Sequence, residues 1–145
     1  MKKYISVIVL GFMLAAAFNQ AQGAATWTSS ECNTDKGGEI VEVGGDSFCK
    51  STSTMNWWSA YSWCQAMGGR MPSIAELCPG QPMTNGTACG RTYARHTWTA
   101  TPVNGSTVWT ISWSDGKSLN STDGSKNKTD ANTYCLKSSG TNNAN

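Results

Sequence analysis

Six cysteines constrain the fold of this 145-residue chain more than any other feature of its sequence. A zinc site is one explanation for several cysteines, but the chain has no C-x-x-C pair and only one histidine, His96. An even number of cysteines in an exported chain predicts three disulfides, with 15 ways to pair them. The six residues are Cys32, Cys49, Cys64, Cys78, Cys89 and Cys135.

The start of the chain has the pattern of an export signal. Lys2 and Lys3 precede an apolar run, Ile5 to Phe18, that is short for a membrane span, and Ala21-Gln22-Gly23 fits a signal-peptidase site. A retained N-terminal anchor is the alternative. We predict a cleaved signal peptide at residues 1–23, one domain at residues 24–137 and a disordered tail at residues 138–145.

The charge of the chain limits its partners. Two of the 11 basic residues lie in the predicted signal peptide, so the remaining basic residues balance the 9 acidic ones. Nucleic-acid binding needs clustered positive charge, so we expect no nucleic-acid partner. We expect the protein to be secreted, periplasmic or at the cell surface, with no transmembrane anchor after cleavage; the oligomeric state stays open.

Two short helices are predicted near the middle of the chain. The first has an apolar face that we interpret as buried core, formed by Trp57, Ala60, Cys64 and Met67 and extended by Tyr61. Ser53, Thr54 or Asn56 can cap its start, and Gly68-Gly69 ends it. The second begins at Ser73, whose hydroxyl can form a capping box with Glu76, and this role argues against Glu76 as a catalytic acid.

Strands are predicted on both sides of the helices. Glu39–Val43 and Phe48–Lys50 form an N-terminal hairpin, with Cys32 and Cys49 at its ends. Residues 81–92 form a loop, and ten residues lie between Cys78 and Cys89, so a local bridge between them is geometrically easy.

The second half of the domain is predicted to be β. Strands are expected at residues 97–101, 107–113 and 133–137, with a two-residue hairpin turn at Asn104-Gly105. Alternation puts Trp109, Ile111 and Trp113 on one face of the second of these strands, which favours a place in the core. The polar segment from Asn120 to Asp130 is predicted to be a long exposed loop.

Two motifs resemble a known family. The spacing Trp57-x-x-Ala60-x-x-x-Cys64-x-x-x-Gly68 resembles the first helix of the C-type-lectin-like fold. Arg70-Met71-Pro72-Ser73-Ile74-Ala75-Glu76-Leu77 resembles a bacterial branch of that fold. This branch includes the C-terminal domain of collagen-like adhesins of the Lcl type and is a distant neighbour of the formylglycine-generating enzymes. The resemblance covers roughly residues 48–137.

The resemblance implies a fold and a disulfide pattern. The fold is α+β, with two short helices packed on a small antiparallel sheet and three disulfides. Cys64 on the first helix pairs with Cys135 on the last strand in this family. The remaining pairs are then Cys32 with Cys49, as in the long form with an N-terminal hairpin, and Cys78 with Cys89.

The chain lacks the sequence signs of a metal site or an active site. Gln81-Pro82-Met83 and Trp113-Ser114-Asp115 depart from the calcium motifs of the family, and Lys126 and Lys128 stand among the oxygen-bearing residues from Asp123 to Asp130. We therefore predict no calcium and no cofactor. No Ser/His/Asp arrangement is recognisable, so we predict a protein that is not an enzyme; His96 is the one candidate base and is expected at the surface, where a strand begins.

The leading hypothesis is a binding module that recognises a glycan or protein at a cell surface, with a role in adhesion. A structural minor subunit of a fimbria or other surface assembly is the alternative, and a hypervariable display protein is a third. Binding residues usually lie on loops and exposed aromatic side chains. The candidates are Trp98, Asn104, Trp113, Asp115, Lys117 and Asn120.

Overall fold

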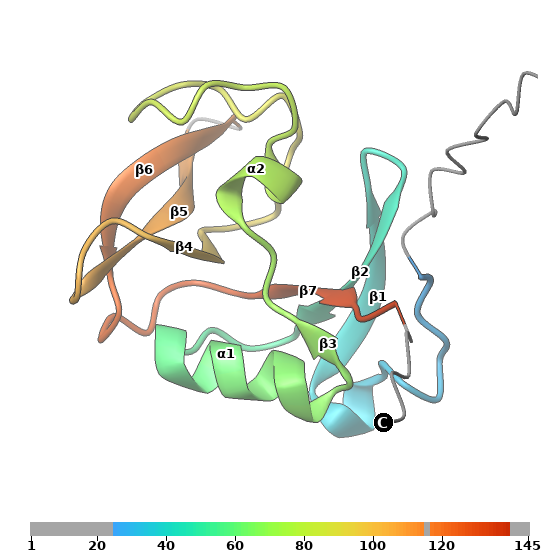
Figure 1. The fold of residues 1–145 in the computed structure, drawn as a ribbon. Helices are drawn as coiled ribbons and strands as arrows, with labels where there is room; N and C mark the ends of the chain where they lie inside the picture. The colour runs from blue at the N-terminus through green and yellow to red at the C-terminus, as the bar shows by residue number, and fades with distance from the viewer. Residues whose placement is uncertain (1–24, 115–116, 140–145) are drawn as a thin grey trace, which may run out of the picture.

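The computed structural model describes residues 25–114 and 117–139 as an α+β structure, in which two helices pack on antiparallel sheets (Figure 1). The predicted signal peptide and all but the first two residues of the predicted tail lie outside the described residues. The predicted α+β class is confirmed.

The first sheet joins the two ends of the domain. Its strand order is β1-β2-β7-β3. The strands are β1 (Gly38–Val43), β2 (Asp46–Ser51), β3 (Gly69–Arg70) and β7 (Tyr134–Lys137), and a 3-10 helix, η1 (Thr34–Lys36), precedes them. The predicted N-terminal hairpin is confirmed: Gly44 and Gly45 form its turn with φ of 60° and 86°, which glycine adopts at low cost.

The second sheet has the order β4-β5-β6. It consists of β4 (Thr97–Pro102), β5 (Thr107–Ser114) and β6 (Lys117–Ser125). The prediction of an exposed loop from Asn120 to Asp130 is wrong for its first part, because Asn120 to Ser125 belong to β6 and Asn120 and Ser121 are buried. It is confirmed for residues 127–130, which are exposed and lie outside the strands. The polar residues of β6 have low strand propensity, but β5 pairs with them on one side. On the other side, the Asn120 N–H donates to Thr87 O over 2.8 Å.

The alternating side chains of β5 are not all buried. The register shift against β6 adds its extra residue to β6, so β5 itself continues to alternate, and Trp113 lies next to the last residue of the strand. Ile111 is fully buried and Trp109 is partly buried, but Trp113 is 43% exposed. The prediction that Trp113 lies in the core is therefore wrong.

The turn at Asn104-Gly105 is longer than predicted. Four residues, 103–106, separate β4 from β5. The Asn104 side-chain oxygen accepts hydrogen bonds from the backbone N–H groups of Ser106 and Thr107, at 2.9 and 3.0 Å. This side chain replaces part of the backbone pairing that would close a two-residue turn.

Helix α1 (Trp57–Ala66) packs with Trp57, Ala60 and Cys64 against β3, β4 and β7. Its N-cap is Asn56, whose side chain accepts from the Ser59 N–H over 2.8 Å. Tyr61 was predicted to extend the buried face, but it is 39% exposed. Its ring stacks on Trp57 at a centroid distance of 5.2 Å, which places it on the solvent side of that residue.

Helix α2 (Ile74–Leu77) is a single turn held by its predicted capping box. The Ser73 hydroxyl accepts from the Glu76 N–H, and the Glu76 carboxylate accepts from the Ser73 N–H over 2.9 Å. Ile74 and Leu77 are buried, as predicted, and the helix packs against β4 and β5.

Three disulfides join Cys32 to Cys49, Cys64 to Cys135 and Cys78 to Cys89. These are the pairs that the family resemblance implies. Cys64–Cys135 ties α1 to the first sheet, whereas Cys78–Cys89 closes a short segment after α2. All six cysteines are buried, at 0–2% exposure.

The core contains three tryptophans with satisfied indole groups. Trp98 Nε1 donates to Met55 O over 2.7 Å, Trp57 Nε1 donates to Thr99 O over 2.8 Å, and Trp27 Nε1 donates to Cys135 O over 3.0 Å. A buried indole N–H needs such a partner, so these bonds fix the orientation of each ring. Trp98 is 1% exposed and is one of the largest fully buried side chains.

The Arg70–Glu76 ion pair predicts how stability depends on acid. The Arg70 guanidinium, with further hydrogen bonds from Ser73, lowers the pKa of Glu76 from 4.5 to about 2. A carboxyl whose pKa is lowered by folding stabilises the folded state at pH values above its unfolded-state pKa. This stabilisation is lost as the carboxyl is protonated, so the free energy of unfolding should decrease as the pH falls from 4.5 to about 2. The carboxyl is partly exposed, so screening leaves about 1 kcal/mol.

Denaturant unfolding at a series of pH values measures this loss. We expect Glu76→Gln to flatten the part of the profile that belongs to this pair and to lower stability at neutral pH by about 1 kcal/mol. Arg70→Gln should have the same effect, since it removes the other partner. Unchanged profiles in both variants would contradict the assignment.

Candidate binding site

Trp113 near the end of β5 is a large aromatic side chain with 43% of its surface exposed. Its backbone N–H donates to His96 Nδ1 over 3.3 Å. This bond joins the end of β5 to the residue before β4. Because Nδ1 accepts, the neutral ring carries its proton on Nε2, which remains a donor.

A hollow of about 380 Å³ lies beside Trp113 and is lined by Ala94, Arg95, His96, Trp113 and Asp130. We call it the Trp113 hollow. It combines an aromatic ring with a guanidinium, an imidazole and a carboxylate. A sugar ring can stack its C–H face on such an indole while its hydroxyl groups bond the polar side chains around it.

A second hollow of about 290 Å³ continues from the first across the β4-β5-β6 sheet. It shares His96 and Asp130 with the Trp113 hollow, and Trp98 lies in its wall with 1% of its surface exposed. Its polar side chains are Thr110, Ser112, Ser121 and Lys128. The two hollows form a depression that is lined by both polar and apolar groups and has one exposed tryptophan on its wall.

Backbone pairing brings the two sides of this depression together. Asp130 and Arg95 lie far apart in the sequence. Thr97 and Asn132 form a parallel bridge, in which the Asn132 N–H donates to His96 O over 2.9 Å and the Trp98 N–H donates to Asn132 O over 3.0 Å. These bonds hold the segment that carries Asp130 against the start of β4.

The charges around the depression are uncompensated. Elsewhere, four ion pairs join Glu39 to Lys50, Glu76 to Arg70, Asp46 to Arg91 and Glu31 to Lys137. Among the residues that the structure describes, Arg95, Lys128 and Asp130 make no ion pair. Charged groups that are free of internal partners can form hydrogen bonds with a ligand without first breaking a contact.

The predicted binding residues fall into different places. Trp113 lines the depression, Lys117 is exposed at the start of β6, and Asn104 is exposed in the β4–β5 turn with its side chain bonded to the backbone. Asp115 lies outside the described residues. Trp98 and Asn120 are buried at 1% exposure, and the Asn120 amide donates to Pro82 O over 3.0 Å, so the premise that these two side chains face solvent is wrong.

Sequence reasoning assigned other roles to the residues that surround Trp113. It considered His96 only as a base and Asp130 only as a calcium ligand, and it left out Arg95 and Ser112. The one local signal was the pair Arg95-His96 directly before a strand that contains a tryptophan. Asp130 could not be found in this way, because only the pairing of Thr97 with Asn132 brings it close.

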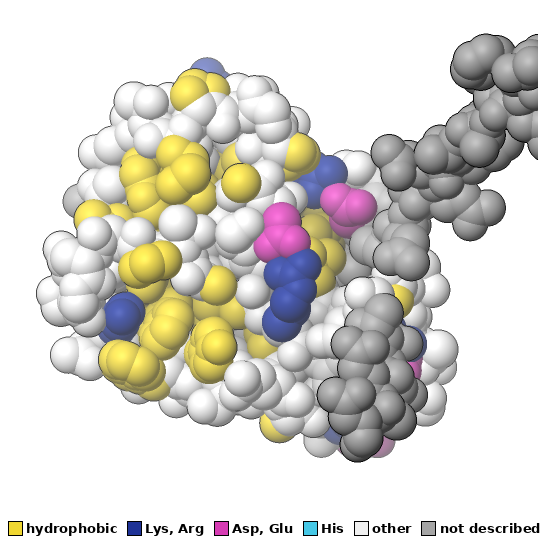
Figure 2. Space-filling view, in the orientation of Figure 1, with side chains coloured by type: hydrophobic (Ala, Val, Ile, Leu, Met, Phe, Trp, Pro, Cys, Tyr) yellow, Lys and Arg dark blue, Asp and Glu magenta, His cyan; other side chains and the backbone are white. Residues whose placement is uncertain are grey.

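A second exposed aromatic surface lies on α1, and Figure 2 shows apolar side chains gathered over this helix. Trp58 is 54% and Tyr61 39% exposed, and the sequence of α1 contains no charged residue. The Lys126 ammonium lies 4.7 Å and 4.9 Å from the ring centroids of Trp57 and Trp58. We call this surface the α1 aromatic face.

The described residues contain neither a cluster of metal ligands nor a membrane-spanning helix. In residues 25–114 and 117–139, no group of three His, Cys, Asp or Glu side chains that could hold a metal ion comes together. No helix in this part of the chain is long and apolar enough to span a membrane.

The fold defines a class of protein: an α+β domain with three disulfides, in which two helices pack on antiparallel sheets. Its candidate site is a depression beside an exposed tryptophan. No family model, curated protein or solved structure matches the chain.

Proposed function

We propose that this protein is an exported binding module that recognises a glycan on a cell surface without calcium. The observation that carries the proposal is the position of Trp113: an exposed indole shares one hollow with Arg95, His96 and Asp130. An aromatic face next to both donors and acceptors suits a ligand that has C–H faces and many hydroxyl groups. A protein ligand with exposed polar side chains is the alternative ligand for the same surface.

We further propose that the domain has a C-type-lectin-like fold. Three features support this: the consecutive helices α1 and α2, the Cys64–Cys135 bridge from α1 to the last strand, and an N-terminal hairpin closed by Cys32–Cys49. In such a scaffold the second sheet and its loops carry the ligand site, and the depression lies there.

Export supports an extracellular role for the domain. The predicted signal peptide and the three disulfides suit an oxidising compartment, which is the periplasm, the cell surface or the medium. An adhesive role follows if the recognised glycan is displayed by another cell.

Replacement of Trp113 tests the site. We expect the folded domain to bind glycans on an array, and Trp113→Ala to weaken titrated binding of the strongest array glycan by roughly thirtyfold. This corresponds to about 2 kcal/mol, as for other tryptophans at the centre of an interface. Trp58→Ala is the matched control: it removes a more exposed tryptophan from the α1 aromatic face and should leave the affinity unchanged.

Two outcomes would contradict the proposal. One is a folded domain that binds no glycan on the array. The other is a Trp113→Ala variant that binds as tightly as the wild type, because the exposed indole would then contribute nothing.

A structural role in a surface assembly is the second candidate function, and the α1 aromatic face favours it. Interface cores are depleted in charged residues and enriched in aromatic ones, and the exposed side of α1 has both properties. Under this function Trp58→Ala, and not Trp113→Ala, would prevent assembly of the protein on the cell surface.

A further inference from the structure

A third hollow, of about 500 Å³, lies next to the Trp113 hollow between the end of β2 and the segment before β4. The two hollows share Ala94 and Arg95. Three consecutive hydroxyl residues, Thr52, Ser53 and Thr54, line its other side. We call it the Arg95 pocket.

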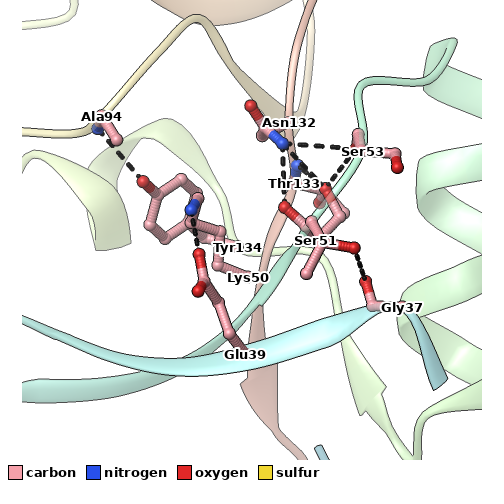
Figure 3. A network of polar contacts seen from close by, with 10 residues as sticks. Gly37, Glu39, Lys50, Ser51, Ser53, Ala94, Asn132, Thr133 and Tyr134 are labelled. Carbon is pink, nitrogen blue, oxygen red and sulfur yellow. Dashed lines mark hydrogen bonds and ion pairs between the residues drawn. The ribbon is translucent and has the colours of Figure 1, made fainter. Parts of the chain in front are cut away.

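The Arg95 pocket carries one uncompensated positive charge. Its charged lining residues are Lys50 and Arg95. Lys50 forms an ion pair with Glu39, which neutralises it (Figure 3). Arg95 is exposed and makes no ion pair in residues 25–114 and 117–139, so its guanidinium is free to pair with an anionic group that enters the pocket.

A buried amide at this pocket has unused hydrogen-bonding capacity. Asn132 is 3% exposed, and its Nδ2 donates to Ser51 O over 2.8 Å and to Ser53 O over 3.2 Å. These bonds fix the orientation of the amide, and Figure 3 shows its oxygen pointing away from Ser51 and Ser53. Within the described part of the chain, Asn132 Oδ1 has no hydrogen-bond partner. The amide therefore holds Ser51 and Ser53 in place beside the pocket, while its oxygen is itself covered by protein.

A hydrogen bond to β7 holds the backbone of Ala94 in place at the pocket. The Ala94 N–H donates to the Tyr134 hydroxyl oxygen over 3.1 Å (Figure 3). Burial raises the pKa of Tyr134, so this hydroxyl stays neutral. The residue before Arg95 is therefore anchored to β7, which fixes the backbone from which the Arg95 side chain extends.

We propose that the Arg95 pocket binds a carboxylated sugar residue, whose neighbour in the glycan occupies the Trp113 hollow. A guanidinium pairs with a carboxylate through two parallel hydrogen bonds, and the three hydroxyl residues suit the hydroxyl groups of a sugar ring. Asp130 lies in the Trp113 hollow, on the other side of Arg95, and repels a carboxylate there. The charges thus direct the acidic sugar to one pocket and the neutral sugar to the other.

This inference rests on the proposed function, so its test uses two sugars that differ only in the group on C5. That group is a carboxylate in one sugar and a hydroxymethyl group in the other. Methyl β-glucuronide and methyl β-glucoside are titrated into the signal-cleaved protein, and amide and indole chemical shifts are followed by NMR, which detects millimolar affinities. We expect the glucuronide to bind at least tenfold more tightly and to shift the amides of Thr54 and Ala94. The glucoside should shift the Trp113 indole.

Arg95→Gln should abolish the preference for the glucuronide, so that the two sugars bind with about the same affinity. Because Arg95 is exposed and unpaired, the variant should keep its fold, which its amide spectrum checks. Lys36→Gln is the matched control: it removes one positive charge from η1, from a residue that does not line the pocket, and should retain the preference. Thr54→Val should weaken the glucuronide several-fold, because one pocket hydroxyl is lost.

The outcomes separate this inference from the proposed function. Equal affinity for both sugars, or a preference that survives Arg95→Gln, overturns the acidic-sugar assignment, while Trp113 shifts with either sugar would still support glycan binding. If neither sugar binds the folded protein at millimolar concentration, the acidic-sugar assignment is wrong. If the glycan array also shows no binding, the proposed function is wrong as well.

Discussion

Replacing Cys64 and Cys135 together by alanine should lower the free energy of unfolding by about 4 kcal/mol, because the bridge closes a long loop in the unfolded chain. The two cysteines are separated by 71 positions. The bridge also ties α1 to β7, and both cysteines are fully buried. A domain of this size has only about 5–15 kcal/mol of net stability, so the loss removes at least about a quarter of it.

The matched control is the double alanine variant of Cys78 and Cys89. These cysteines are also buried, at 1% exposure each, but their separation is only 11 positions. The shorter loop predicts a loss of about 3 kcal/mol. Urea unfolding of both variants measures the two losses under the same conditions, and a larger loss for the short bridge would contradict the loop-closure explanation.

Replacing Trp98 by alanine should destabilise the protein by about 3–5 kcal/mol, the range found when a buried aromatic ring is removed from a core. Trp98 is 1% exposed, and its indole N–H donates to Met55 O. The variant loses the packing of the ring and leaves the Met55 carbonyl without its partner.

Two further variants separate these contributions. Trp98→Phe keeps most of the apolar ring but removes the N–H, so it should cost about 1–3 kcal/mol for the unsatisfied carbonyl. Trp113→Ala removes the same type of side chain from an exposed position and should change stability by less than about 1 kcal/mol. If Trp98→Ala costs no more than Trp113→Ala, the assignment of Trp98 to the core is wrong.

The contrast between Trp98 and Trp113 shows where sequence reasoning about the site reaches its limit. Both tryptophans lie in segments that alternate like strands, and both were candidates for stacking on a ligand. Trp113 is exposed because it lies next to the last residue of β5, beyond the part of the strand that packs in the core, whereas the pairing of β4 with β5 and Asn132 decides the burial of Trp98. Neither the end of the core nor the strand pairing leaves a signal within a single segment.

The sequence by itself determined the features that depend on local chemistry. Glycines, capping residues and helical spacing are enough to predict α1, α2 and the N-terminal hairpin, because each stabilises the backbone of its own neighbours. The number of cysteines predicted three disulfides, and the family resemblance implied their pairing. Only the tertiary structure decided what depends on residues far apart in the chain.

The clearest cases are β6 and the depression beside Trp113. Asn120 and Ser121 are poor strand residues, and they form a strand because β5 and the segment around Thr87 satisfy their backbone groups on both sides. Arg95 and Asp130 line one hollow because Thr97 pairs with Asn132. Backbone hydrogen bonds made by other residues bring these two side chains to the same hollow. Those bonds exist only once the whole chain has folded.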